Sequence, residues 1–290
     1  MIKYNPKFWF KHIFAFHKSD TFIVIWKELI YIGVFTLVLA FFLMNYLRIE
    51  DLARLEKLKD VFALVGFVLS LLLVFRTNTA YDRWWEGRKK WGELVNNSRN
   101  LAIKIGSMTT NKENEIYFSR MIPNYAYAMK EHLRDGVKLN ELDLTKVELN
   151  EIQNLGHKTS FIAKKMYSKL HQMKQHGELT QEEFLALDDN LKNFSNITGA
   201  CERIKNTPIP YSYSSFLKKF IFVFVGTLPL SFVPVFGYYS AFVAVFVFYV
   251  LVSMEILAEE IEDPFGNDEN DLPTDSLCEK IKDNVKEILL

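Results

Sequence analysis

Apolar residues are concentrated in three long runs, and most charged residues lie between them. Residues 29–46 and 61–75 contain no Asp, Glu, Lys or Arg, and residues 220–257 are almost wholly apolar over nearly twice the length of one membrane span. A helix needs roughly 20 mostly apolar residues to cross a bilayer. The runs therefore predict membrane-spanning helices. Residues 61–75 form a short run, for which a buried helix of a soluble protein is the alternative.

The last run is interrupted near its middle by Pro229, Pro234 and Gly237. Proline and glycine disfavour a continuous helix and favour a turn. We therefore expect a turn between two antiparallel helices, at about residues 216–236 and 239–257. Together with the first two runs, these make four transmembrane helices.

The residues before the first run combine lysines with aromatic side chains. This mixture is typical of a segment that lies on the membrane surface, and a simple basic flank is the alternative. Lysines before the first span place the N-terminus in the cytoplasm, and an even number of spans returns the C-terminus to the same side. We expect four regions: residues 1–81 with the surface segment and transmembrane helices 1–2, a helical cytoplasmic domain at 82–215, transmembrane helices 3–4 within 216–257, and an acidic cytoplasmic tail at 258–290.

Residues 82–205 are rich in charge and show helical spacing of apolar positions, for example at Leu94 and Leu101. Thr180 followed by Glu183 is the pattern of a capping box, which predicts a helix start. Strand signals are weak, so the fold class is expected to be all-α. Breaks between the helices are expected near residues 109–113, 135–142 and 176–179.

Composition narrows the range of functions. The 290 residues carry 35 basic and 35 acidic side chains, so charge does not indicate a nucleic-acid partner. Cys201 and Cys278 are too few for a disulfide framework or a cysteine-based zinc site. Phosphate-loop, dinucleotide-binding, zinc-protease and serine-hydrolase motifs are absent, so no enzyme activity is expected. No two of the six histidines are three or four residues apart, the spacing that places two imidazoles on one helix face.

The second apolar run continues into residues 76–86 without glycine or proline, so one helix is expected to extend from the bilayer into the cytoplasm. On it, Ala63, Phe67, Leu71 and Phe75 are spaced by four and share one face. This face either packs against other helices or lines a pore, where a narrow apolar ring stops ions by excluding water. No span carries a charged residue near its centre, which disfavours an ion-coupled transporter.

Three distinctive stretches occur in a defined order relative to the apolar runs. They are residues 76–92 (RTNTAYDRWWEGRKKWG), 207–210 (TPIP) and 259–273 (EEIEDPFGNDENDLP). Through these motifs the chain resembles the bestrophin family of ion channels over nearly its whole length, particularly the bacterial branch. The resemblance implies a homopentamer around one central pore, with the second helix of each subunit lining a narrow neck.

The resemblance also assigns pore positions. It implies that Phe67, Leu71 and Phe75 form the neck, which is the stripe that the four-residue spacing singles out. It places a second constriction, at the cytoplasmic exit, at Ile209. Because the edges of phenylalanine rings carry partial positive charge, the neck would also favour anions that pass those edges.

A calcium site is a further implication. Eukaryotic bestrophins hold calcium in an acidic loop after the fourth helix, and the matching loop here offers Asp263, Asp268 and Asp271. Oxygen ligands at this spacing suit calcium. The aspartate run of the eukaryotic loop is interrupted here by asparagine and glutamate. The alternative is therefore a structural turn that anchors the tail to a neighbouring subunit.

The motif Asp82, Arg83, Trp84 and Trp85 is expected to be structural. Tryptophan favours the headgroup region of a membrane, so both indoles are candidate interfacial anchors. The charged residues of the motif, together with Glu86, are expected to form salt links between helices.

The sequence thus favours a passive, bestrophin-like ion channel in the inner or plasma membrane. Its partners would be further copies of itself, the lipid bilayer and small inorganic ions, with no required cofactor. The ion stays open, since eukaryotic members pass chloride and other anions whereas the bacterial branch resembles them in shape and can prefer monovalent cations such as sodium. The alternatives are an ion-coupled secondary transporter and a membrane-bound sensor or scaffold.

Overall fold

The computed structural model describes residues 21–47 and 49–290, and every regular element within them is a helix, as expected. The predicted membrane-surface segment lies before residue 21, outside the described residues. The helices are, in chain order, α2 (Thr21–Tyr46), α3 (Ile49–Glu56), α4 (Lys59–Met108), α5 (Lys112–His132), η1 (Leu139–Glu141), α6 (Lys146–Ile152), α7 (Lys158–Gln175), α8 (Gln181–Asn206), α9 (Tyr211–Thr227), α10 (Pro229–Phe236), η2 (Gly237–Tyr239), α11 (Ser240–Glu262) and α12 (Thr274–Leu289).

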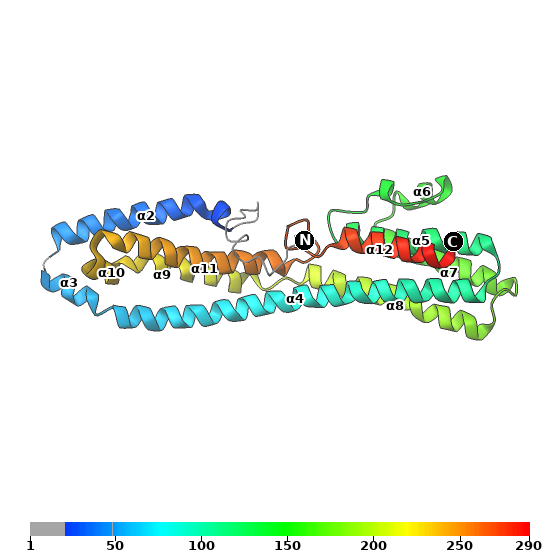
Figure 1. Ribbon diagram of the computed structural model, residues 1–290, viewed down its shortest axis with the longest axis horizontal. Helices are drawn as coiled ribbons and strands as arrows, with labels where there is room; N and C mark the ends of the chain where they lie inside the picture. The colour runs from blue at the N-terminus through cyan, green and yellow to red at the C-terminus, as the bar shows by residue number, and fades with distance from the viewer. Residues whose placement is uncertain (1–20, 48) are drawn as a thin grey trace.

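These helices build an elongated molecule with two distinct ends (Figure 1). The apolar helices α2, α9, α10 and α11 lie at one end, and the polar helices α5, α7, α8 and α12 lie at the other (Figure 1). Helix α4 has 50 residues and extends from the apolar end into the polar end. At 1.5 Å per residue it is about 75 Å long. The prediction that one unbroken helix leads from the second apolar run into the polar region is confirmed.

Three helical segments are long and apolar enough to cross a membrane, namely Thr21–Tyr46, Ala53–Met108 and Tyr211–Glu262. The third segment folds back on itself, because α11 returns beside α9 and α10 (Figure 1). The reversal falls in η2, where Gly237 adopts a φ of 53° that glycine tolerates without strain.

The turn falls where the sequence predicts it, between residues 236 and 239, and both prolines precede it. Pro229 is the first residue of α10, where the missing N–H removes no helical hydrogen bond, and Pro234 lies within the same short helix. The chain therefore reverses over three residues after the prolines.

Each end has its own core. At the apolar end, α4 packs against α9 and α11 through a cluster that includes Leu69, Leu73, Ile221, Phe224 and Leu251. At the polar end, the second half of α4 packs against α5, α8 and α12, and α7 packs against α5 and α8. That core contains, among others, Trp91, Leu94, Phe118, Met121 and Phe194.

The predicted breaks between polar helices agree with the structure. Helix α4 ends at Met108 and α5 begins at Lys112, and α7 and α8 are separated by residues 176–180. The capping box is present: the Thr180 hydroxyl accepts from the Glu183 N–H at 3.2 Å, and the Glu183 carboxylate accepts from the Thr180 N–H at 2.8 Å.

Candidate functional site

The predicted neck residues lie on the outer surface of the subunit. The exposed fraction is 67% for Phe67, 45% for Leu71 and 57% for Phe75, although all three are apolar. Leu69 and Leu73 on the same helix are almost completely buried. Helix α4 therefore turns one apolar face into the subunit and presents another outward, and the neck stripe belongs to the outward face.

A buried charge cluster begins directly after this stripe. Arg76 is 1% exposed and lies between α4 and α11. Its Nη2 donates to Glu262 Oε2 at 2.7 Å, and its Nε lies 3.6 Å from Glu255 Oε2. The sequence analysis missed this cluster. Its only signal was a cation at the end of one apolar run and two acidic residues near the end of another.

Glu262 also contacts the segment that carries the predicted aperture. Its second oxygen, Oε1, accepts from the backbone N–H of Ile209 at 2.5 Å, and the Ile209 side chain is half-buried. One carboxylate thus connects the residue that follows Phe75 with the backbone of Ile209. The two predicted constrictions are held by the same side chain.

Arg83 binds the C-terminal ends of two helices, α8 and α11. Its guanidinium donates to the backbone carbonyls of Ile204 and Thr207, both at 2.5 Å, and of Glu262 at 3.1 Å. Carbonyls at the C-terminal end of a helix lack intrahelical donors, and a cation satisfies them while opposing the negative end of the helix dipole. Arg83 therefore ties α4 to the ends of α8 and α11.

The expected salt links of this motif are found in part. Glu86 pairs with Arg203 of α8 at 2.7 Å, whereas Arg83 binds carbonyl oxygens instead of a carboxylate, and Asp82 is exposed. Trp84 donates from Nε1 to the backbone carbonyl of Asn270 at 3.1 Å. Its indole therefore contacts the loop that follows α11.

This loop, residues 263–273, lies closely against α4. A Cβ atom added to Gly87 would lie 3.1 Å from the ring of Phe265 and 3.2 Å from Pro264. Both loop residues are buried. Glycine at this position lets the turn approach the helix backbone, which explains why the glycine follows the tryptophans.

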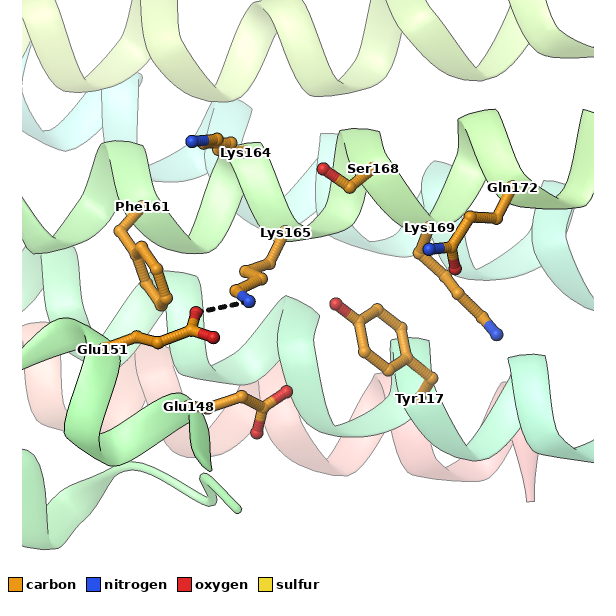
Figure 2. A pocket seen from close by; sticks show the side chains of 9 residues that line it. All are labelled: Tyr117, Glu148, Glu151, Phe161, Lys164, Lys165, Ser168, Lys169 and Gln172. Atoms are coloured by element: carbon orange, nitrogen blue, oxygen red, sulfur yellow. Dashed lines mark ion pairs between the residues drawn. The ribbon is translucent and has the colours of Figure 1, made fainter. Parts of the chain in front are cut away.

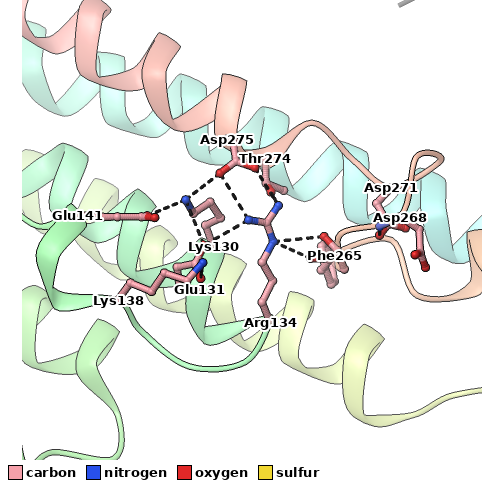
Figure 3. Close-up of polar contacts among 11 residues, drawn as sticks. Lys130, Glu131, Arg134, Lys138, Glu141, Phe265, Asp268, Asp271, Thr274 and Asp275 are labelled. Atoms are coloured by element: carbon pink, nitrogen blue, oxygen red, sulfur yellow. Dashed lines mark hydrogen bonds and ion pairs between the residues drawn. The ribbon is translucent and has the colours of Figure 1, made fainter. Parts of the chain in front are cut away.

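Side chains at the end of α5 and just after it hold the other side of the loop and the start of α12 (Figure 3). Arg134 donates from Nε to the carbonyls of Phe265 and Gly266, each at 3.2 Å, and from Nη2 to Asp275 at 3.0 Å. Lys130 donates to the same carboxylate at 2.8 Å. Burial alone would raise the pKa of Asp275, but hydrogen bonds from Arg134 and Lys130 outweigh it and lower that pKa to about 2. The carboxylate is therefore ionised at neutral pH and anchors α12 to α5.

The three aspartates expected to bind calcium do not converge. Asp263 and Asp268 are exposed, whereas Asp271 is 2% exposed and its Oδ2 accepts from the Asp268 N–H at 2.6 Å. They do not form a group whose ligand atoms all lie within 4.8 Å of one another. Burial, together with the nearby acidic side chains, raises the pKa of Asp271 to about 6. In this arrangement the three carboxylates do not by themselves supply one common set of ligand atoms for calcium.

The loop packs against helices of its own subunit. Gly87 of α4 and Arg134, which follows the end of α5, both contact it, so the described contacts anchor the tail to other parts of the same chain. One buried oxygen, Asp271 Oδ1, has no hydrogen-bond partner.

A pocket of about 320 Å³ lies between α5, α6 and α7, at the polar end (Figure 2). Lys165 forms an ion pair with Glu151 there, and Glu148 is held by Arg120 at 2.6 Å. Burial raises the pKa of Tyr117, which also lines the pocket, to about 12. The pocket belongs to the polar helices and is separate from the outward stripe on α4.

Comparison with known proteins identifies the family. The family model described as Bacterial/Fungal Bestrophin protein matches residues 1–287. The voltage-dependent anion channel-forming protein YneE of Escherichia coli (strain K12) is 30% identical over 284 residues, which cover 97% of this chain and 92% of that protein. A voltage-dependent anion channel-forming protein of Nostoc sp. is 35% identical over 230 residues, which cover 77% of this chain and 75% of that protein.

The solved structures agree with this match. A bacterial Bestrophin homolog from Klebsiella pneumoniae superposes with a TM-score of 0.83 at 25% identity, over 91% of this chain and 98% of that chain. The family match, together with the long apolar helices, makes this an integral membrane protein. The chain belongs to the bacterial and fungal bestrophin family.

Proposed function

We propose that five copies of the chain form an ion channel, with α4 of each copy facing a common axis. Phe67, Leu71 and Phe75 would form the neck and Ile209 the aperture at the cytoplasmic exit. The observation that carries the proposal is the outward exposure of the neck stripe beside the buried residues of the same helix. An apolar face of this kind needs lipid or further protein as its partner.

A ring of identical subunits supplies what one subunit lacks. Helices of one subunit pack on each other, whereas a closed ring leaves a passage along its symmetry axis. Rings of apolar side chains in a narrow passage exclude water, and a small widening admits ions. In this assembly the apolar helices cross the membrane four times, and both termini and the polar end lie in the cytoplasm.

The contact through Glu262 supports coupled constrictions. Arg76 follows the last neck residue, and the carboxylate that it binds also accepts from the N–H of Ile209. A shift of α4 at the neck would therefore be transmitted to the aperture through one ion pair. No enzymatic step and no cofactor is needed for this activity.

We assign the channel to anions. The relatives from Escherichia coli and Nostoc are named as voltage-dependent anion channel-forming proteins. Phenylalanine rings at two of the three neck positions present partially positive edges to a passing ion. Chloride is the simplest ion to test.

A monovalent cation is the second candidate, and one observation favours it. Asp82 is exposed and lies seven residues after Phe75, which is about two helical turns along the same face of α4. Five copies would place a ring of carboxylates below the neck, and such rings attract cations.

Planar-bilayer recording of the purified protein under a salt gradient tests both assignments. An anion channel gives unitary currents that reverse near the chloride equilibrium potential. Phe67→Ala widens the neck and should increase the current, whereas Phe42→Ala, which removes an exposed phenylalanine of α2, should leave it unchanged. If Phe67→Ala leaves the ratio of anion to cation permeability unchanged, the ring edges do not select the ion.

Other outcomes separate the alternatives. Reversal near the sodium equilibrium potential, moved toward chloride by Asp82→Asn, would establish the cation channel. Saturable flux coupled to a proton or sodium gradient, without unitary currents, would establish a transporter and overturn the proposal. The proposal would also be overturned if light scattering showed that the detergent-solubilised protein is a monomer. Because the aspartates of the 263–273 loop do not converge, we expect the currents to be independent of calcium.

A further inference from the structure

Two histidines and one glutamate from distant parts of the chain meet at the polar end. His132 is the last residue of α5, His157 precedes α7, and Glu202 lies on α8. The Nε2 atom of His132 lies 2.6 Å from Glu202 Oε1, and the Nε2 atom of His157 lies 3.0 Å from the same oxygen. The two imidazole rings are 4.7 Å apart between centroids.

We propose that these three side chains form a binding site for a divalent transition-metal ion of the zinc class. One ligand atom from each residue lies within 4.8 Å of the others, and among the described residues this is the cluster with that property. Two imidazoles and a carboxylate form a ligand set that zinc uses with a water molecule in the fourth position. Imidazole nitrogen favours zinc, copper, nickel and cobalt over magnesium and calcium.

Neighbouring hydroxyl groups orient one of the ligands. The Nδ1 atom of His157 lies 2.9 Å from the hydroxyl of Thr159 and 2.9 Å from that of Ser160. A hydrogen bond at Nδ1 fixes the plane of the ring and directs Nε2 toward Glu202, as in protein sites where a second polar group orients a metal-bound histidine. Thr159 is completely buried, so this partner is itself held in place.

Both imidazoles approach the same carboxylate oxygen, which brings three possible metal ligands together at one point. Glu202 has two carboxylate oxygens, yet both imidazole nitrogens approach Oε1. The separations of 2.6 and 3.0 Å are hydrogen-bond distances, and a metal ion would take the place of the protons shared between these atoms, so that binding releases protons. All three side chains are partly exposed, at 24% for His132, 50% for His157 and 29% for Glu202, so an ion can enter from solvent.

Binding would join three helices near the aperture segment. Glu202 is seven residues before Ile209 in the chain, and it is followed by Arg203 and Ile204, which contact Glu86 and Arg83 of α4. Lys205 already ties the same part of α8 to α5, because its Nζ donates to the carbonyl of Leu133 at 2.5 Å. The metal would therefore restrain the end of α8.

The test is metal binding by the purified, untagged full chain in detergent. Calorimetry should show one bound Zn²⁺ per subunit. When cobalt replaces zinc, the protein should show the visible absorption typical of four-coordinate Co²⁺. Zn²⁺, but not Mg²⁺, should raise the midpoint of thermal unfolding by several degrees. His157→Ala and Glu202→Gln should each weaken Zn²⁺ binding by about 10-fold or more. The Glu202→Gln variant keeps a hydrogen-bond acceptor for the histidines, so it guards against a loss of folding.

His171→Ala is the matched control, because His171 is exposed on α7 and its ring contacts Gln175. It should keep wild-type affinity, cobalt absorption and thermal shift. Absence of Zn²⁺ binding to the wild type at micromolar concentration overturns the proposal. Equal affinity in wild type, His157→Ala and Glu202→Gln overturns it as well, since the bound ion would then lie elsewhere. Binding is measured without any current, so its failure is distinguishable from failure of the channel assignment.

Discussion

The two halves of α4 differ in where they place large apolar side chains, although they belong to one uninterrupted helix. In the apolar half, Phe67 is 67% exposed and Phe75 is 57% exposed, whereas in the polar half Trp91 and Leu94 are completely buried. The apolar half therefore carries many large side chains on its outside, whereas the polar half buries most of its own among α5, α8 and α12, with Trp85 and Ile103 as exposed exceptions. The backbone is the same, so the difference lies in the solvent that each half meets.

This contrast defines what each half contributes. A large apolar side chain in water is driven into a core, and the polar half obeys that rule. On the apolar half lipid replaces water, so burial inside the subunit brings no comparable gain and apolar residues are free to face outward. Outward residues in that half are therefore available for a pore or for contact with another copy, whereas the polar half provides the rigid support.

The strongest way to break the comparison is to truncate one large side chain in each half. Trp91→Ala removes a fully buried indole whose N–H has no hydrogen-bond partner, so the loss is one of packing. We expect it to cost about 3–5 kcal/mol of unfolding free energy. Phe67→Ala should cost less than about 1 kcal/mol and change conductance instead. Denaturant unfolding of both variants in one detergent makes the measurement, and equal losses would show that Phe67 is a core residue.

The second test concerns the charges where the halves join. Arg76→Leu leaves Glu255 and Glu262 facing each other without a cation, and removal of one partner from a buried ion pair typically costs about 3–5 kcal/mol. We expect a value near the lower end, about 3 kcal/mol, because Glu262 keeps the N–H of Ile209. Adding Glu255→Gln to Arg76→Leu should recover part of the loss.

The exposed ion pair of the same region is the control for that test. Lys218 and Glu259 form a 2.8 Å contact, and their side chains are 49% and 55% exposed. Lys218→Ala should change the unfolding free energy by less than about 1 kcal/mol. A loss from Lys218→Ala as large as that from Arg76→Leu would mean that burial does not distinguish the two pairs.

Local patterns predicted much of this molecule. The length of the apolar runs, the absence of breakers after Phe75 and the capping residues Thr180 and Glu183 anticipated the long α4 helix and the start of α8. The four-residue spacing of Phe67, Leu71 and Phe75 predicted that they share one face of a helix, and all three are exposed on α4. Each of these features depends on residues close together in the sequence.

Contacts between distant segments could not be predicted in the same way. Arg76 meets Glu262 across 186 positions, and His132 meets Glu202 across 70. Neither pair leaves a periodic signal, because the partners are set by how whole helices pack.

The third test measures how closely α4 is packed in its polar half. Gly87→Ala places a methyl group about 3.1 Å from the ring of Phe265, which must move. Such overpacking costs about 1–3 kcal/mol, and the better helix propensity of alanine returns about 1 kcal/mol, so we expect a net loss of about 1 kcal/mol. Limited proteolysis should then cut residues 263–273 faster.

The matched change is Gly199→Ala on α8, where nothing lies within 4 Å of an added methyl group. It should be neutral or stabilise the protein by up to about 1 kcal/mol, because alanine favours a helix. Stabilisation by Gly87→Ala as well would show that the turn at Phe265 does not rest tightly on α4.

The smallest expected effect is a pH dependence of the protein's stability that comes from Asp271, in the 263–273 loop that packs against α4. The folded-state pKa of Asp271 is raised by burial to about 6, above its ordinary value of 3.8, so the native protein binds this proton more tightly than the unfolded chain. The stability that comes from the protonated carboxyl is fully present below about pH 4 and is lost as pH rises through about 6. Asp271→Asn keeps an oxygen for the Asp268 N–H and removes the charge.

This substitution should therefore raise the thermal midpoint at pH 7.5 and leave it almost unchanged at pH 4. We expect less than about 1 kcal/mol at pH 7.5, because a small opening of the turn would admit water to the carboxylate. Asp189→Asn, at an exposed position on α8, controls for the general loss of one negative charge and should show no such difference between the two pH values. A gain for Asp271→Asn that is equal at both pH values would mean that Asp271 does not titrate between them, and the cost of its burial would have to lie in packing instead of charge.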